Sequence, residues 1–225
     1  MLLTPGSLSS AVPVVIFSDF TCPFSHVAEA ALRRRAAAGE VTVEYRAFEL
    51  YPVPAPLPEM PDAAAGSDAV QRLAEAVGVR LGAPGFVPRT RKAHEAARFA
   101  AEHGVGPELR EAIFDAYWGD GRDIGRIDVL VELGVALGLD RSELKVELDV
   151  DRYTAAVERD EAEARRLGLG ATPALIVGSG ADIELVVGAL PEAELDELLR
   201  SQKSEARSQK NDAPDLRPAP PNPES

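Results

Sequence analysis

The sequence predicts an α/β fold in which a long helical segment separates two parts that contain strands. Three observations predict it. Residues 12–48 have the pattern of a strand, a helix and a second strand, residues 68–167 are helical in pattern, and residues 174–200 have the pattern of two short strands and a helix. The 225 residues are 45% hydrophobic and 27% charged, which is ordinary for a globular protein with one large core or two small ones.

The first strand-containing part is predicted to be a βαβ unit. An apolar run at Val12–Phe17 indicates a buried strand, and Pro23–Ala38 indicates a helix that Gly39 ends. In Val41–Phe48 apolar and polar residues alternate, which is typical of a second strand. Two strands joined by one helix are expected to run parallel, with a right-handed crossover.

A proline-rich segment follows the second strand, with prolines at positions 52, 54, 56, 58 and 61. Because proline fixes its backbone angle and lacks an N–H, this segment cannot be a helix or a central strand. We expect an extended, polyproline-type connector that marks a domain boundary. A ligand for a proline-binding module is the functional alternative.

The rest of the chain is predicted to be a helical subdomain, a β-hairpin, a final helix and a tail. The expected helices of the subdomain are Asp68–Val79, Arg89–His103, Glu108–Trp118, Ile127–Leu137 and Ser142–Leu148, and Asp151–Leu167 leads back out of it. Ala174–Val177 and Ile183–Val187 indicate the hairpin, and Pro191–Arg200 the final helix. Residues 1–10 are expected to be a flexible N-terminus, and the polar, proline-rich residues 201–225 a disordered tail.

Charge and composition argue against several classes of function. The formal net charge of −13 argues against nucleic-acid binding, which requires an excess of Lys and Arg. No apolar stretch is long enough to span a membrane and no signal peptide is visible, so we expect a cytoplasmic protein without membrane contact. His26, His94 and His103 lie far apart with no second cysteine nearby, so no metal site is expected.

Cys22 is the candidate nucleophile. It is the only cysteine, so no intrachain disulfide can form, and it lies where the first strand gives way to the first helix. A thiol at a helix N-terminus is close to free backbone N–H groups and to the positive end of the helix dipole, which favour the thiolate. A small buried hydrophobic residue is the alternative for a free cysteine.

The order of motifs resembles the thioredoxin-fold proteins of the DsbA superfamily, and most closely their FrnE-like branch. The resemblance covers residues 12–200, and the segments that carry it are Ser18–Ser25, Tyr45–Leu50, Thr90–Ala96, Ile113–Trp118, Gly121–Ile124 and Gly170–Ala174. It implies a thioredoxin-like domain made of residues 11–51 and 153–200, with an inserted helical domain at 60–152. It also implies that Thr172 and Pro173 form a cis-proline loop beside Cys22 that binds substrate. The substrate groove is expected between the two domains.

One departure from the family pattern decides the expected chemistry. FrnE-like enzymes carry a second cysteine three residues after the first, and Ser25 stands there in the sequence Cys22-Pro23-Phe24-Ser25. A serine hydroxyl cannot resolve a mixed disulfide, so the expected activity is thiol–disulfide exchange or isomerisation through one thiol. No tightly bound cofactor is expected. Glutathione or another small thiol is the expected co-substrate, protein or small-molecule thiols and disulfides are the expected partners, and a homodimer is possible.

The neighbours of Cys22 have candidate roles as well. The hydroxyl and backbone N–H of Ser25 could donate to the thiolate, or Ser25 could be an ordinary helix cap. His26 lies four residues after Cys22, where a protonated imidazole would favour the thiolate; a solvated rim histidine is the alternative. Phe24 is expected to pack or to line the groove with Pro23.

A basic cluster of Arg89, Arg91 and Lys92 stands near the start of a predicted helix, where cations oppose the helix dipole. One explanation is that these residues flank the groove and bind the carboxylates of glutathione. The other is that they pair with Glu95 and other acidic residues.

Two other functions stay open. The glutathione-using kappa-class transferases and the 2-hydroxychromene-2-carboxylate isomerases resemble this architecture, with a Ser-Pro-x-Ser motif at the corresponding helix start. Cys22-Pro23-Phe24-Ser25 is intermediate between that motif and Cys-x-x-Cys, so a glutathione-dependent isomerase or transferase is the first alternative. A thioredoxin-fold binding module without turnover is the second.

Overall fold

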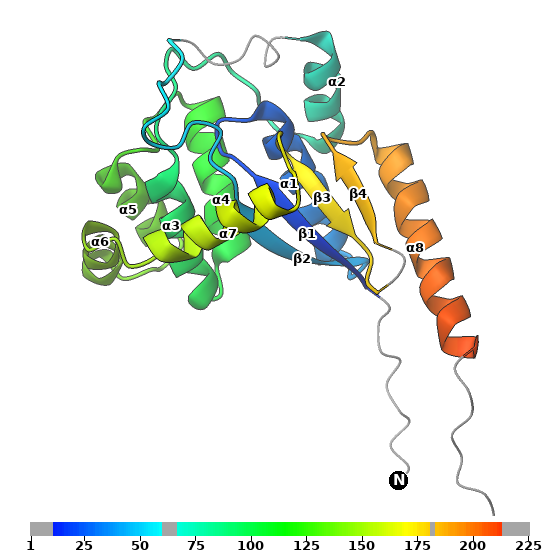
Figure 1. Ribbon diagram of the computed structural model, residues 1–225. Helices are drawn as coiled ribbons and strands as arrows, with labels where there is room; N and C mark the ends of the chain where they lie inside the picture. Colours follow the sequence, from blue (N-terminus) through cyan, green and yellow to red (C-terminus); the bar gives the residue numbers. More distant parts are fainter. Residues whose placement is uncertain (1–10, 60–66, 181–182, 213–225) are drawn as a thin grey trace, which may run out of the picture.

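The structure is a computed structural model that describes residues 11–59, 67–180 and 183–212, with side chains to residue 204 (Figure 1). The strands are β1 (Val12–Ser18), β2 (Val41–Ala47), β3 (Ala174–Val177) and β4 (Glu184–Val187). The helices are α1 (Pro23–Ala37), α2 (Asp68–Val77), α3 (Arg91–Glu102), α4 (Gly106–Phe114), the π-helix η2 (Asp115–Gly119), α5 (Ile127–Ala136), α6 (Arg141–Asp149), α7 (Thr154–Arg166) and α8 (Glu192–Asp212).

The four strands form one sheet in the order β2-β1-β3-β4. β1 and β2 are parallel, with Val14 opposite Val43, which confirms the predicted βαβ unit. β3 and β4 are antiparallel neighbours, which confirms the predicted hairpin. β3 also pairs antiparallel with β1, with Ile16 opposite Leu175, so the C-terminal part of the chain completes the sheet that the N-terminal part begins.

Helices cover both faces of this sheet, as Figure 1 shows, with α7 crossing one face and α1 lying behind the other. Side chains of a strand alternate between the two faces. Val14 and Ile16 accordingly belong to one buried cluster with residues of α1 and α8, whereas Phe17 belongs to a second cluster with Ala164 of α7. The fold class is therefore a thioredoxin-like α/β fold, as the sequence predicts.

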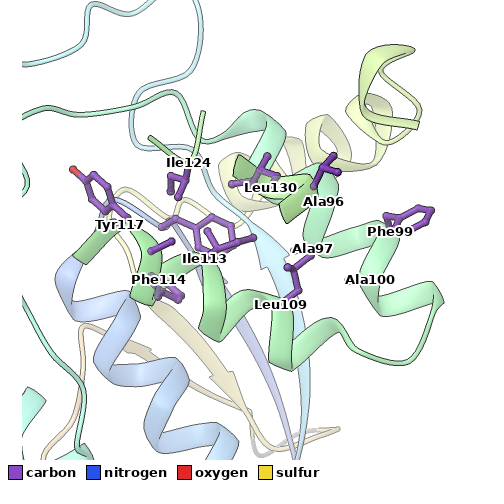
Figure 2. Close-up of a cluster of buried hydrophobic side chains, with 14 of the residues drawn as sticks. Ala96, Ala97, Phe99, Ala100, Leu109, Ile113, Phe114, Tyr117, Ile124 and Leu130 are labelled. Carbon is purple, nitrogen blue, oxygen red and sulfur yellow. The ribbon is translucent and has the colours of Figure 1, made fainter. Parts of the chain in front are cut away.

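The helical part has its own buried cluster, built mainly by α3, α4, η2, α5 and α6. Figure 2 shows Phe99, Leu109 and Leu130 among its side chains. Phe20 belongs to this cluster although it lies in the loop directly after β1, and its carbonyl oxygen accepts a hydrogen bond from Trp118 Nε1 at 3.0 Å. The loop that leads to Cys22 is therefore anchored in the helical part.

Three boundaries differ from the sequence-based expectation. α2 lies within the range expected for the inserted domain, yet Val70 and Ala74 pack in a separate cluster with Val27 of α1. The helix expected at Glu108–Trp118 is α4 followed by the π-helix η2. The tail is expected to be disordered from Ser201, but α8 continues to Asp212. The first turns of α8 pack in the cluster of sheet residues through Leu195 and Leu199.

Residues 1–10, which were expected to be a flexible N-terminus, lie outside the described residues. So do residues 213–225 of the expected tail. Among the described residues, none of the helices is both long enough and apolar enough to span a membrane.

Candidate active site

Cys22 lies at the N-cap of α1, as the sequence predicts. Its backbone is extended, with φ −92° and ψ 118°, and Pro23 occupies the first helical position, where its missing N–H costs nothing. The Cys22 N–H donates to the carbonyl oxygen of Asp19 at 3.1 Å, and the Ser25 N–H donates to the Cys22 carbonyl oxygen at 3.1 Å. The tight turn after β1 and the first turn of α1 together hold the backbone of Cys22.

The Cys22 side chain faces the loop that precedes β3. Its Sγ donates a hydrogen bond to the carbonyl oxygen of Thr172 at 3.2 Å. The Thr172–Pro173 peptide bond is cis, as the family resemblance implies. The Thr172 Oγ1 is buried and has no hydrogen-bond partner among the described residues. Thr172 and Pro173 therefore form one wall of the environment of the thiol.

The protonation state of Cys22 differs from the expectation. Burial raises the pKa of the thiol above its usual value, because only 6% of the residue is exposed and the thiolate loses hydration. The side chains of Thr172 and Ser25 and the Ser25 N–H lower the pKa, and the charge of Asp19 raises it. The helix N-terminus alone does not make Cys22 a thiolate in this closed arrangement.

Asp19 connects the parts of the site, a role that the sequence analysis missed. Its carboxylate accepts hydrogen bonds from the Thr21 N–H at 2.7 Å, the Thr21 hydroxyl at 2.6 Å, the Leu50 N–H at 2.8 Å and the Thr90 hydroxyl at 3.0 Å. Burial raises the Asp19 pKa, and these donors oppose that shift. The carboxylate thus ties the Cys22 loop to the end of β2 and to the start of α3.

Ser25 is fully buried and lies at the third helical position, so it is not the cap of α1. Its hydroxyl accepts a hydrogen bond from the Asp19 N–H at 3.3 Å. Its hydroxyl and backbone N–H both lower the Cys22 pKa. Of the two roles expected for Ser25, helix capping is wrong, and support of the thiolate stays a prediction.

The expectations for His26 are both wrong. The residue is 2% exposed, and its ring stacks on Phe114 with the ring centres 4.8 Å apart. Burial, followed by the charge of Arg33, lowers the His26 pKa to about 3, although Nε2 lies 3.7 Å from Asp115 Oδ1. His26 is therefore a neutral packing residue at pH 7, not an imidazolium beside the thiolate and not a solvated rim residue.

Phe24 is partly exposed and packs beside the cluster formed by Val27, Val70 and Ala74. Its ring therefore lies on the α2 side of the Cys22 helix. Pro23 is buried. The packing role expected for Phe24 is the one that the structure displays.

The side chains of the basic cluster all have partners within the chain. Arg89 donates to the carbonyl oxygens of Tyr51 at 2.5 Å and Ala55 at 2.7 Å. Arg91 pairs with Glu49, Glu158 and Glu161, and Lys92 pairs with Glu95 at 2.7 Å and with Asp151. The ion-pair alternative accounts for Arg91 and Lys92, because their charges are already neutralised by neighbouring carboxylates.

The structure has a cavity between the two parts, where a groove was expected. This cavity of about 330 Å³ lies between β2 and helices α3 and α4, but Cys22 is not among the residues that line it. In the described residues there is also no group of three or more His, Cys, Asp and Glu side chains that could hold a metal ion.

A buried ion pair behind the site was likewise missed from the sequence. Arg110 of α4 donates through Nε to Glu29 Oε2 at 2.7 Å and through Nη2 to Glu29 Oε1 at 2.5 Å. The Ser18 hydroxyl donates to Glu29 at 2.6 Å. The sequence feature that could have predicted this ion pair is Glu29 on the alanine-rich, apolar face of α1. A carboxylate on a buried face needs a partner of opposite charge.

Comparisons with known proteins agree with this fold. The Bacillus subtilis (strain 168) protein YwbO is 32% identical over 179 residues, which are 74% of this chain and 87% of YwbO. A probable DsbA oxidoreductase, SCO1869 from Streptomyces coelicolor, has a solved structure that matches with a TM-score of 0.69 and 25% identity, over 92% of this chain and 94% of SCO1869.

A second solved structure is the cytosolic disulfide reductase DsbM from Pseudomonas aeruginosa, with a TM-score of 0.64 and 18% identity over 88% of this chain and 98% of DsbM. At that identity the likeness shows the fold. Residues 13–200 match the family model of the DSBA-like thioredoxin domain. With Cys22 at the start of α1 and the cis-proline loop beside it, the chain belongs to the DSBA-like thioredoxin domain family.

Proposed function

We propose that the protein catalyses thiol–disulfide exchange through Cys22 alone, by way of a mixed disulfide. The observation that carries the proposal is the 3.2 Å hydrogen bond from the only thiol of the chain to the Thr172 carbonyl oxygen, in the loop of the cis-proline. Membership of the DSBA-like family supports an enzyme of the oxidoreductase or isomerase kind. We also propose, from the sequence motifs, that the protein belongs to the FrnE-like branch of this family.

The reaction has two steps that balance in atoms and electrons. The Cys22 thiolate attacks one sulfur of a disulfide R–S–S–R′, forms Cys22–S–S–R and releases R′–S⁻. A second external thiolate then attacks the sulfur of R, releases the Cys22 thiolate and forms a new disulfide with R. No resolving thiol of the chain takes part, because Ser25 stands at the position of the second cysteine.

The surroundings of Cys22 support the thiolate once a substrate is bound. When Sγ loses its proton it no longer donates to Thr172, and that carbonyl becomes free to accept a hydrogen bond from an extended peptide or a glutathione backbone. The side chains of Ser25 and Thr172 lower the Cys22 pKa. The Thr172 Oγ1 has no hydrogen-bond partner among the described residues, so it is available to donate to Sγ once the thiolate forms. Burial has the opposite effect, so the first step is expected to become faster as the pH rises.

Glutathione is the proposed co-substrate, and a cytoplasmic location is part of the same proposal. The structure of DsbM has been solved with GSH, which makes a small thiol a reasonable first probe. The basic residues Arg91 and Lys92 have no part in this proposal, since acidic side chains already pair with them.

The test is mass spectrometry of the native protein after incubation with oxidised glutathione across a pH series. One glutathionyl group on Cys22, released by a second thiol, is the expected result, and Cys22→Ser is the control that should take up none. Ser25→Cys should form an internal disulfide and gain insulin reduction, because it restores the resolving thiol.

Two outcomes would replace the proposal with an alternative. Reversible binding of reduced glutathione without an adduct would favour the glutathione-dependent isomerase or transferase. Neither adduct nor binding at any pH would leave a thioredoxin-fold binding module without turnover.

A further inference from the structure

The strand β4 is an open edge of the sheet, because β3 pairs with one of its sides and no described strand pairs with the other. Figure 1 shows β4 at this edge, beside α8. The Gly188 N–H donates to the Pro173 carbonyl oxygen at 2.8 Å, so the backbone of Gly188 faces β3. Backbone groups of an antiparallel strand point alternately to its two sides. The N–H and C=O groups of Leu185 and Val187 therefore point away from β3, where a further strand could pair with them.

The same residues expose aliphatic side chains. Leu185 is 52% exposed and Val187 is 58% exposed, and Ile183, which directly precedes the strand, is 53% exposed. Leu185 lies opposite Ile176, which packs against the cluster that contains residues of α7, so these side chains are on the α7 face of the sheet. Exposed edge positions usually carry a charge or a proline. Aliphatic side chains beside free backbone groups are instead typical of a surface that binds another chain.

The other face of β4 borders a groove of about 490 Å³ beside α8. Val186 of β4 and Leu198 of α8 form part of its apolar lining. Its carboxylates are Glu184 of β4 and Glu194 and Glu197 of α8, all of which are exposed. None of these three carboxylates forms an ion pair with a described residue, and no Lys or Arg is among the described residues that line the groove.

The cations of this part of the chain lie on another side of α8. Arg200 and Lys203 line a separate hollow together with Arg35 and Asp196. Arg35 pairs with Asp196 at 2.5 Å. The carboxylates beside β4 are therefore not neutralised, and the negative potential of the groove favours a partner with cationic side chains.

We propose that the open edge of β4 is a docking surface for an extended segment of a partner protein in which aliphatic and basic residues alternate. The segment adds a strand to the sheet, and its backbone pairs with Leu185 and Val187. Side chains of a strand alternate between the two faces, so its aliphatic residues lie beside Leu185 and Val187 and its basic residues point towards Glu194 and Glu197. This surface does not depend on the thiol chemistry of Cys22.

A second copy of this chain fits the edge less well. In a two-fold pairing of β4 with β4 of another copy, both α8 helices would lie on the same face of the joined sheet. Glu184 and the carboxylates of α8 would then approach the same residues of the other copy. Like charges at neighbouring positions destabilise a strand pair, so the charge of this edge favours a basic segment.

The test is a fluorescence anisotropy titration of labelled peptides with the full chain carrying Cys22→Ser, which removes thiol exchange. The first peptide is Lys-Val-Lys-Val-Lys-Val-Lys, and the second has the same residues in two blocks, Lys-Lys-Lys-Lys-Val-Val-Val. The alternating peptide is expected to bind about tenfold or more tightly than the block peptide. Equal affinities, or no binding of the alternating peptide, would overturn the proposal.

Two methylated forms of the alternating peptide test whether it adds as a strand. The valines share the face of Leu185 and Val187, so their N–H groups are the ones that bond to β4, whereas the N–H groups of the lysines point away from it. N-methylation of the valines should weaken binding by about tenfold or more, and N-methylation of the lysines should change it little. Equal losses would contradict strand addition.

Variants of the chain locate the surface. Leu185→Pro removes an N–H at the edge but no bond to β3, a place where proline is tolerated, and should weaken binding of the alternating peptide. Glu194→Gln with Glu197→Gln should weaken it as well. Glu108→Gln with Glu143→Gln changes the net charge equally at exposed positions of the helical part and should bind like the parent. Equal weakening by both pairs would indicate attraction to the whole acidic protein and contradict the proposal. Circular dichroism of each variant confirms that the fold is retained.

Sedimentation velocity of the chain carrying Cys22→Ser tests the other occupant. A monomer is expected in the absence of peptide. A dimer that Leu185→Pro dissociates would assign the edge of β4 to a second copy of the chain and overturn the proposal.

Discussion

Cys22 and Thr172 are 150 residues apart in the chain, and in the folded protein the Cys22 thiol donates a hydrogen bond to the Thr172 carbonyl oxygen at 3.2 Å. This bond satisfies the neutral thiol and joins the start of α1 to the loop before β3. A substrate must replace the thiol at that carbonyl while the thiolate forms. The reactivity of Cys22 therefore depends on both segments.

The first prediction concerns the pH dependence of Cys22. Because burial raises its pKa, the rate of alkylation by iodoacetamide should rise with pH and reach half of its plateau above about 8.5, the ordinary value for a free thiol. Thr172→Val removes a hydroxyl that lowers this pKa and should move the midpoint further up. Cys22→Ser is the blank. A midpoint below the free-thiol value would show that the helix N-terminus outweighs burial.

The second prediction concerns the buried pair of Glu29 and Arg110. Glu29→Gln removes one charge and leaves the buried Arg110 without its counter-ion, so the free energy of unfolding should fall by about 3–5 kcal/mol. The double variant Glu29→Leu with Arg110→Met should lose less than Glu29→Gln alone. Denaturant unfolding measures both. Lys145→Gln, which breaks the exposed pair with Asp149, serves as the control and should change little.

The third prediction concerns acid stability. The pKa of His26 is about 3 in the folded protein and 6.5 in the unfolded chain, so between these values the unfolded state binds the extra proton. Stability should therefore fall as the pH falls below 6.5, by up to about 1.4 kcal/mol per pH unit from this residue. His26→Phe keeps the stacking on Phe114 and should reduce the slope. His103→Gln, at an exposed position, is the control and should leave the slope of stability against pH unchanged. A slope in His26→Phe equal to that of the parent protein would contradict the assignment to His26.

The fourth prediction concerns the stability cost of His94. Its two ring nitrogens are buried without a partner among the described residues, and such groups cost about 1–3 kcal/mol each. His94→Phe retains an aromatic ring against Phe20 and should raise the free energy of unfolding by about 1 kcal/mol or more. Chemical denaturation measures the difference. A loss of stability would mean that the imidazole has a structural partner in solution.

The fifth prediction concerns the approach of Gly82 to η2. The Gly82 N–H donates to the Trp118 carbonyl oxygen at 2.8 Å, and a Cβ at position 82 would lie 2.4 Å from that oxygen. Gly82→Ala should therefore lower the free energy of unfolding by about 1–3 kcal/mol. Gly85 is the matched control, because a Cβ there has no atom of the described residues within 4 Å. Similar melting temperatures for the two variants would show that the loop shifts freely.

The local patterns of the sequence predict most elements because their causes are local. The alternation in Val41–Ala47 and the apolar run in Val12–Ser18 identify two strands, and one helix between them requires a parallel pair. Pro23 after Cys22 marks the start of α1. By contrast, the pairing of β3 with β1 depends on how the helical segment returns to the sheet, which no local pattern records.

The candidate site was predicted in part for the same reason. The place of Cys22 at the start of α1 follows from neighbouring residues, whereas its burial and its bond to Thr172 depend on a loop 150 residues away. Both expectations for His26 considered only its own helix, and they are wrong because Phe114, on another segment, packs against the ring. The sequence left two explanations open for Arg91 and Lys92, and the ion pairs with Glu49 and Asp151, on other segments, favour the ion-pair explanation.

The sequence by itself determined that a single thiol, without a resolving cysteine, stands at a helix N-terminus in an α/β chain. Helix starts and strand alternation depend on neighbouring residues, and the number of cysteines can be counted directly. Only the tertiary structure decided the protonation of that thiol, the neutrality of His26 and the existence of the cavity beside His94. Desolvation and charge pairing depend on which distant segments meet, and packing determines that.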